Sequence, residues 1–245
     1  DTGSTLSITG LVKNSNWTGT PLTGGFIKAG AGTLTLSGGN TYSGQTNITA
    51  GTVVAANSTA LGVGGFNGTS STNISNGATL AFQGNVSLDE HMHLTGAGVG
   101  GLGALRSISG NNALTMTNGN SGTGPGLAID GNTTIGVDAG TLTVSGFYHD
   151  SGSHGITKVG AGTLTFSSNS TYTGGTTISE GAVIAGGGGV AKGAVTIASG
   201  ATLSTTSSAS TVEPPMRMSP NRGSDVIVVV AASSPTPTTY RTRPS

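Results

Sequence analysis

The chain of 245 residues contains no cysteine, and this absence alone excludes several classes of protein. Without thiols there is no disulfide scaffold, thiolate zinc site, iron–sulfur cluster or thiol nucleophile. Charged residues make up only 7% of the chain, where about 25% is usual, and nine basic side chains balance nine acidic ones. A chain so poor in Lys and Arg lacks the basic face that neutralises phosphates, which excludes nucleic-acid binding.

Long apolar segments and aromatic residues are also scarce. No apolar run approaches the roughly 18–20 residues of a membrane-spanning helix, and aromatic residues make up 4% of the chain. Glycine, in contrast, supplies 45 residues, and Gly, Ser and Pro together form about a third of the chain. Such a composition indicates disorder unless the sequence has a period.

A period is present, and it is strong. Residues 28–57 and 158–187 are identical at 16 of 30 positions without a gap. Within both copies, a glycine followed by one or two small residues and an aliphatic residue recurs, and the step from Gly32 to Gly51 equals the step from Gly162 to Gly181. A period of about 20 residues is typical of a solenoid, in which each turn is one supersecondary unit.

The pattern inside each unit indicates which solenoid this is. Residues 33–36 (TLTL) and 163–166 (TLTF) alternate polar and apolar side chains, as short strands do, while Gly, Asn and Ser clusters between them predict tight turns. We find no helical apolar stripe of useful length. Residues 1–204 are therefore predicted to form an all-β, single-stranded, right-handed parallel β-helix of about ten coils, each of roughly 19–26 residues. Aliphatic ladders would fill its core, and Thr, Ser and Asn would coat its surface.

The two long copies resemble the autotransporter-associated β-strand repeat, which has the pattern K-x-G-x-G-T-L-x-L-x-G-x-N-T-Y-x-G-x-T-x-I-x-x-G-x-L. Lys28 and Lys158 begin the copies. The positions that we expect to be structural are Gly30, Gly32, Leu34, Tyr42, Gly44, Ile48 and Gly51 in the first copy, and Gly160, Gly162, Leu164, Tyr172, Gly174, Ile178 and Gly181 in the second. The repeat is found in passenger domains of type V secreted bacterial surface proteins. The resemblance implies a β-helical passenger that leaves the cell through a C-terminal outer-membrane barrel, and it implies no catalytic residues.

Both ends of the sequence depart from a complete autotransporter. The start shows no signal-peptide pattern, and the end shows no series of barrel strands, so we expect a passenger fragment or a truncated reading frame. Residues 205–245 hold six of the eight prolines, four of the five arginines and one glycine. Two interpretations of this Pro/Arg-enriched tail remain open, a disordered linker (or a terminal strand) and a shifted reading frame.

The densest polar cluster is a candidate metal site. On a single strand, Asp89, His91 and His93 would share one face, and imidazole and carboxylate groups are normal zinc ligands. No further ligand is identifiable, so the alternative is a solvent-facing strand with no metal or other cofactor. Glu90 would then lie on the apolar side, which predicts a coil edge or a bulge at that residue.

Two other groups could support catalysis. A His149–Asp150 pair with His154 nearby could perform acid–base chemistry, but no nucleophile accompanies it, and the segment is also interpreted as a loop protruding from the rod. Asp130 and Asp138 could belong to a carbohydrate-active site, which needs two or three acidic groups in one cleft. The acidic residues are too widely spread along the chain to favour this, so we expect no enzyme.

Threonine pairs recur at positions 33/35, 115/117, 141/143 and 163/165. Stacked on one flat face, they would form the kind of surface that ice-binding solenoids use. The simpler interpretation is that β-branched Thr coats a sheet well.

The sequence therefore favours a structural or adhesive, non-catalytic passenger segment of a secreted or surface-exposed bacterial protein. The alternatives are a carbohydrate-active β-helix enzyme and an ice-binding solenoid. Expected partners are glycans or proteins on host or neighbouring cells and an outer-membrane barrel outside this chain, with no membrane-spanning segment, and the chain itself is expected to be monomeric.

Overall fold

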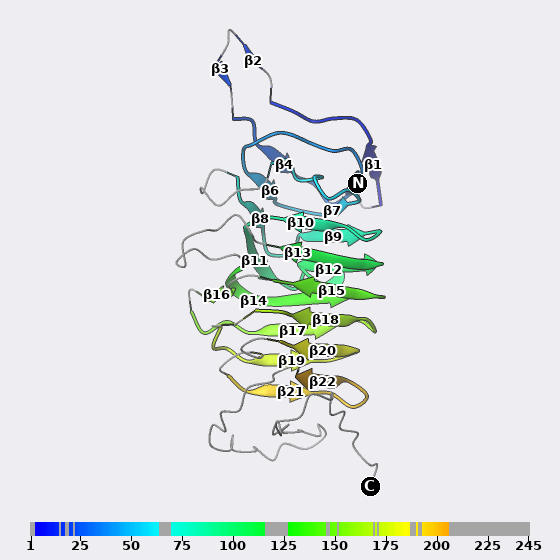
Figure 1. Cartoon of the computed structure of the whole chain (residues 1–245), viewed down its shortest axis with the longest axis vertical. Coiled ribbons are helices and arrows are strands. Elements are labelled where there is room, and N and C mark those ends of the chain that lie inside the picture. Colours follow the sequence, from blue (N-terminus) through cyan, green and yellow to red (C-terminus); the bar gives the residue numbers. More distant parts are fainter. Residues whose placement is uncertain are drawn as a thin grey trace.

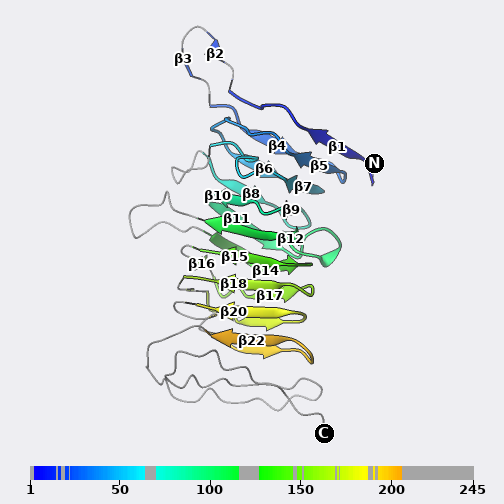
Figure 2. The ribbon, with the colours of Figure 1, turned by 45° about the vertical axis from the view of Figure 1, so that its right-hand side comes forward.

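The computed structural model describes residues 3–14, 16–17, 20–21, 23–63, 70–115, 127–145, 148–150, 152–168, 170, 172–186, 190 and 193–205. Its strands are short and lie across the long axis of the molecule, stacked one above another from β1 at one end to β21 and β22 near the other (Figures 1 and 2). All described strand pairs are parallel except β2–β3. The predicted all-β parallel β-solenoid is thus confirmed.

The strands form three faces, which are named here by the strands that pair along them. Face 1 contains β4 (Phe26–Lys28), β6 (Thr46–Ile48), β8 (Thr72–Ile74), β11 (Met92–Gly96), the start of β14 (Leu127–Val137) and β16 (Tyr148–Asp150). Face 2 contains β1 (Thr5–Ile8), β5 (Thr33–Leu36), β7 (Thr52–Ala55), β9 (Thr79–Gln83), β12 (Leu105–Ser109), the end of β14, β17 (Ile156–Val159), β19 (Thr176–Ile178) and β21 (Val195–Ile197). Face 3 contains β10 (Ser87–Asp89), β13 (Asn111–Thr115), β15 (Thr141–Val144), β18 (Thr163–Phe166), β20 (Ala182–Ala185) and β22 (Thr202–Thr205).

The number of coils is lower than expected. From β5 to β21 the chain makes about seven turns, not ten. The reason is that the middle turns are longer than the first: β5 begins at Thr33 and β7 at Thr52, but β9 begins only at Thr79 and β12 at Leu105. The turn that begins at β9 contains a strand on each of the three faces (β9, β10 and β11), and a count based on the short period of the repeat did not allow for turns of this length.

The two repeat copies do not lie on the same faces. The first strand of the first copy, β4, belongs to face 1, whereas its equivalent in the second copy, β17, belongs to face 2. Likewise β5 belongs to face 2 and β18 to face 3. The long strand β14 bends between faces 1 and 2, pairing with β11 and β16 near its start and with β12 and β17 near its end. The second copy is therefore rotated by one face relative to the first.

The core is made of columns of aliphatic residues, one from each coil. On face 2 the column runs through residues paired in register, all aliphatic except one lysine, namely Leu34, Val53, Leu80, Leu105, Ile135, Lys158, Ile178 and Ile197. The repeat residues Leu34, Ile48, Leu164 and Ile178 are all buried in the core. The column begins at Leu6, which pairs with Leu34 and is 61% exposed at the end of the stack.

The repeat lysines occupy core columns yet hydrogen-bond at a corner. The Lys158 side chain is fully buried between Ile135 and Ile178, and its Nζ donates to the carbonyl oxygens of Val159 (2.9 Å), Gly160 (2.7 Å) and Glu180 (3.3 Å). Lys28 Nζ makes the equivalent bonds to the carbonyl oxygens of residues 29, 30 and 50. Each lysine therefore ties the corner of its own coil to the corner of the next, which explains the first position of the repeat.

Glycine is required where these corners stack. Gly181 has φ of 66°, in the left-handed region, and a Cβ added to it would lie 2.5 Å from the carbonyl oxygens of Gly160 and Gly162. Gly51 has the same conformation in the first copy, with φ of 69°. The remaining repeat glycines lie in the same corner and turn segments, namely Gly30, Gly32, Gly44, Gly160, Gly162 and Gly174.

The repeat tyrosines are buried in the turns that follow β5 and β18. The Tyr172 hydroxyl lies 2.6 Å from Thr176 Oγ1, and the Tyr42 hydroxyl lies 2.7 Å from Thr46 Oγ1. Both tyrosines are at most 3% exposed. The Tyr and Thr of the repeat are therefore a hydrogen-bonded pair inside the solenoid, which leaves neither tyrosine available to stack on a ligand.

We predict that Tyr172→Phe lowers the free energy of unfolding by about 1 kcal/mol, because the buried Thr176 hydroxyl loses its partner while ring packing is kept. Urea denaturation followed by circular dichroism measures the change. Tyr172→Phe combined with Thr176→Val should recover most of the loss, since both polar groups are then removed. A double variant as unstable as the sum of the two single variants would contradict this account.

Smaller elements project from the stack. The antiparallel pair of β2 (Asn16–Trp17) and β3 (Thr20–Pro21) precedes β4 and extends beyond the end of the solenoid (Figure 1). A short 3-10 helix, η1 (Val99–Gly101), lies between β11 and β12. The last described strand, β22, ends at Thr205, so the predictions for the tail fall on residues 206–245, which lie outside the described part of the chain.

Candidate functional site

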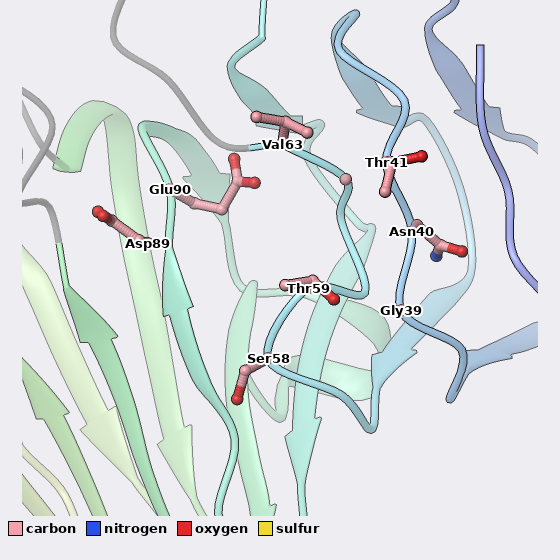
Figure 3. Close-up of a pocket in the computed structure, with 9 residues that line it drawn as sticks. Gly39, Asn40, Thr41, Ser58, Thr59, Val63, Asp89 and Glu90 are labelled. Atoms are coloured by element: carbon pink, nitrogen blue, oxygen red, sulfur yellow. The ribbon is translucent and has the colours of Figure 1, made fainter.

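A pocket opens at the first strand of face 3. In the coils that precede β10, this side of the solenoid is formed by the turns after β5 and β7, which do not pair with β10 as strands. The end of β10 and these two turns therefore leave a hollow between them, with a volume of about 380 Å³. The residues that line it are Gly39, Asn40, Thr41, Ser58, Thr59, Gly62, Val63, Asp89 and Glu90 (Figure 3).

Glu90 is the unusual residue in this lining. It is only 3% exposed, and one oxygen of its carboxyl group accepts a hydrogen bond from Thr72 Oγ1 at 3.2 Å. Figure 3 shows this carboxyl directed towards the turn that carries Val63. Burial, supported by the nearby charge of Asp89, raises the pKa of Glu90 to about 8. Glu90 is therefore largely protonated at neutral pH.

The other polar groups around the pocket hold the turns together. The Asn40 side chain accepts a hydrogen bond from the Val12 amide (2.8 Å) and donates one to the Ala60 carbonyl oxygen (2.6 Å), joining three successive coils. Ser58 Oγ accepts a hydrogen bond from the Ser87 amide at 3.1 Å. The turns that frame the pocket are thus fixed by cross-coil bonds, which makes it a preformed hollow.

The expected metal cluster is divided between two faces. Asp89 ends β10 on face 3, while His93 lies in β11 on face 1, because the chain turns a corner at Glu90 and His91. The coil edge expected at Glu90 is confirmed, but the single strand through Asp89, His91 and His93 is not formed. No group of three or more His, Asp or Glu side chains suited to a metal ion occurs within the described ranges.

His93 contacts a different carboxylate, that of Asp130, and His91 packs against the His93 ring. His93 Nδ1 lies 2.8 Å from Asp130 Oδ2, and the rings of His91 and His93 are in edge contact with centroids 4.8 Å apart. Burial, with the neighbouring His93, lowers the pKa of His91. Asp130, which sequence analysis considered for carbohydrate chemistry, is thereby hydrogen-bonded to His93 on face 1.

The remaining candidate residues, Asp138, His149, Asp150 and His154, lie on three different segments of the chain. Asp138 binds the Arg106 guanidinium, with Oδ2 2.6 Å from Nη2 and 3.0 Å from Nε. Asp130 and Asp138 thus have separate partners. His149 and Asp150 belong to β16, which pairs with β14, so the prediction of a protruding loop is wrong for these two residues. His154 Nδ1 lies 3.2 Å from the Ile129 carbonyl oxygen.

The threonine pairs are divided in the same way. Thr33 and Thr35 lie on face 2, whereas the pairs 141/143 and 163/165 lie side by side on face 3. Thr117 of the remaining pair lies outside the described residues. The rotation between the two repeat copies therefore separates the threonines that a single flat array would need to bring together.

Sequence reasoning identified Glu90 only as a residue on the wrong side of a strand, and it missed the pocket. Thr41, Ser58 and Thr59 lie in turn segments whose composition resembles every other turn of the chain. The one available signal was an acidic residue at an apolar position in a chain with few charges, since such a residue is costly to bury.

Comparisons with known proteins agree with the architecture. Residues 26–55 and 156–185 each match the passenger-associated-transport-repeat. Over 176 residues, 70% of this chain, the sequence is 34% identical to the "Adhesin BmaC autotransporter" of Brucella suis biovar 1 (strain 1330). The chain spans about 4% of the length of that relative. No solved structure matches the chain.

Both segments are therefore copies of the repeat of autotransporter passengers, and the resemblance stated from the sequence is confirmed. The same findings indicate a cell-surface or secreted location. Within the described residues, no helix is long and apolar enough to cross a membrane.

Proposed function

We propose that the chain is an adhesive passenger segment, a rigid surface-exposed scaffold without catalytic activity. The observation that carries the proposal is the pair of passenger repeats built as stacked coils, in a chain similar to an autotransporter adhesin. In this proposal, export requires an outer-membrane barrel elsewhere in the longer protein. Attachment to glycans or proteins of host or neighbouring cells would be multivalent, since many chains on one surface raise the effective concentration of weak sites.

The pairing of the carboxylates supports a non-enzymatic role. Asp130 and Asp138 are held by separate partners, His93 and Arg106. A polysaccharide hydrolase needs two carboxyl groups on either side of one scissile bond. Since Asp130 and Asp138 each pair with a different basic residue, we propose that this part of the chain binds without turning over a substrate.

Attachment of beads coated with the purified chain tests the adhesive role. We predict that coated beads attach to epithelial cells or to bacteria several-fold more than beads coated with an equal mass of albumin, and that soluble chain inhibits this attachment. Attachment equal to that of albumin beads on both cell types would contradict the proposal. Release of reducing sugar from surface polysaccharides on prolonged incubation would contradict the non-catalytic part.

A further inference from the structure

The lining of the pocket beside Glu90 has one sign of charge. Asp89 and Glu90 contribute two carboxyl groups, and no Lys, Arg or His is among the described residues that line it. The titratable groups that interact with Glu90 are Asp89 and the buried Tyr42, which are both acids. With Asp89 charged and no cationic side chain in the described lining, the pocket disfavours anions such as sialic and uronic acids and favours a neutral or cationic ligand.

The shape and the polar groups of the pocket restrict the ligand further. A volume of about 380 Å³ is at the lower end of the range of small-molecule sites, which suits a single small ring. The hydroxyl-bearing residues Thr41, Ser58 and Thr59 are among those that line the pocket, and Val63 adds an apolar side chain. Thr72 donates to one oxygen of the Glu90 carboxyl, and Figure 3 shows this carboxyl group directed towards the turn of the pocket that carries Val63. This combination matches a ligand that carries several hydroxyl groups and one basic group.

We propose that this pocket binds a hexosamine, a sugar ring with a free primary amine, whose ammonium group pairs with the Glu90 carboxylate. The hydroxyl groups of the sugar hydrogen-bond to the two turns that hold Thr41 and Ser58. This inference rests on the proposed adhesive function and assigns it a ligand class and a site. Because the turns are fixed by the bonds of Asn40, the pocket needs little ordering before it binds.

A calcium site fits the same pocket less well. Calcium needs six to eight oxygen ligands at about 2.3–2.6 Å, and the pocket is far larger than one ion. The Asn40 side-chain oxygen, the one amide oxygen in the lining, already accepts a hydrogen bond from Val12. Calcium nevertheless provides a clear competing outcome for the experiment.

Isothermal titration calorimetry of the purified full chain tests the inference. At pH 6.5 both the sugar amine and Glu90 carry a proton, so forming the ion pair must release one. We expect methyl glucosaminide to bind at least about tenfold more tightly than methyl glucoside or its N-acetyl counterpart, which is the size of one charge-assisted hydrogen bond. Titrations in buffers of different ionisation enthalpy should show release of nearly one proton per bound amino sugar.

Variants locate the binding. Glu90→Gln keeps the hydrogen bond to Thr72 but cannot ionise, so it should bind the three sugars about equally and release no proton. Glu180→Gln, a matched change at an exposed carboxylate on a later coil, should behave like the wild type. Equal affinity of the wild type for the three sugars, binding of calcium in place of the amino sugar, or unchanged preference in Glu90→Gln would each overturn the inference.

The bead assay separates this inference from the adhesive function. If the inference holds, Glu90→Gln beads attach more weakly than wild-type beads, and methyl glucosaminide competes with the wild type. Full attachment by Glu90→Gln beads would reject the pocket as the adhesive site and leave adhesion intact. Absence of attachment by wild-type beads would instead reject the adhesive function itself.

Discussion

Replacing Lys158 with alanine is expected to lower the free energy of unfolding by about 2–4 kcal/mol. The substitution removes the donor for the carbonyl oxygens of Val159, Gly160 and Glu180, and it leaves a cavity between Ile135 and Ile178. In the wild type, burying the ammonium group costs some of the stability that Lys158 provides, and the same burial lowers the pKa of Lys158 to about 8. We expect the three hydrogen bonds and the packing of the aliphatic part of the Lys158 side chain to exceed that cost. Without Nζ, the carbonyl oxygens at the corners of two neighbouring coils lose their hydrogen-bond donor at the same time.

Two other lysines serve as controls for this prediction. Lys28→Ala should cost less, because Lys28 occupies the first regular coil and is 9% exposed, which lets water reach the carbonyl oxygens that it binds. Lys13 is exposed, so Lys13→Ala should change the stability by less than about 0.5 kcal/mol. Guanidinium denaturation of the three variants provides the comparison. If Lys158→Ala proved as stable as Lys13→Ala, the corner bonds would have no role in holding the coils together.

Replacing Glu90 with glutamine is expected to stabilise the protein at pH 8 by about 2–4 kcal/mol while leaving its stability at pH 4 nearly unchanged. The folded state raises the pKa of Glu90 from 4.5 to about 8, so between these values it binds a proton that the unfolded chain has released. The stabilisation that this proton provides is fully present below pH 4.5 and is lost as the pH rises through 8. Glutamine cannot ionise, so the variant does not suffer this loss.

The difference between the unfolding curves of wild type and Glu90→Gln at a series of pH values measures the effect. Other groups titrate alike in both proteins and cancel in the difference. Asp89→Asn is an informative companion, since removing the neighbouring charge should shift the Glu90 transition to lower pH. A wild type that loses no stability relative to Glu90→Gln between pH 4 and 8 would show that Glu90 is not buried as described.

The strands of the repeat could be predicted from the sequence, but the structural roles of several of its residues could not. Alternation at 33–36 and 163–166 predicts strands, and the buried Leu34 and Leu164 confirm which side faces inwards. The pairing of Tyr172 with Thr176, in contrast, joins two residues whose side chains meet only because the turn brings them together. No pattern in the sequence separates that interaction from ordinary packing of a tyrosine at a turn.

The candidate site shows the same division more sharply. A buried acid at position 90 was foreseeable from its place among apolar residues, but its neighbours in the pocket come from turns of the two preceding coils, about 27 to 51 residues earlier in the chain. Those neighbours depend on which coil lies above which. The prediction of a metal cluster on a single strand was wrong for a related reason. The chain turns a corner at Glu90, which places Asp89 and His93 on different faces.

By itself, the sequence determined the class of fold and the repeat. The alternation of inward and outward side chains and the corner glycines are local properties, and they recur in successive coils. Only the tertiary structure decided how the coils align. Three-stranded turns and the bend in β14 rotate the second copy by one face, and this rotation separates the threonine pairs. Stacking of unlike turns above β10 creates the pocket at Glu90. Such features depend on the combined length of all preceding coils, and the period of the repeat does not give that length.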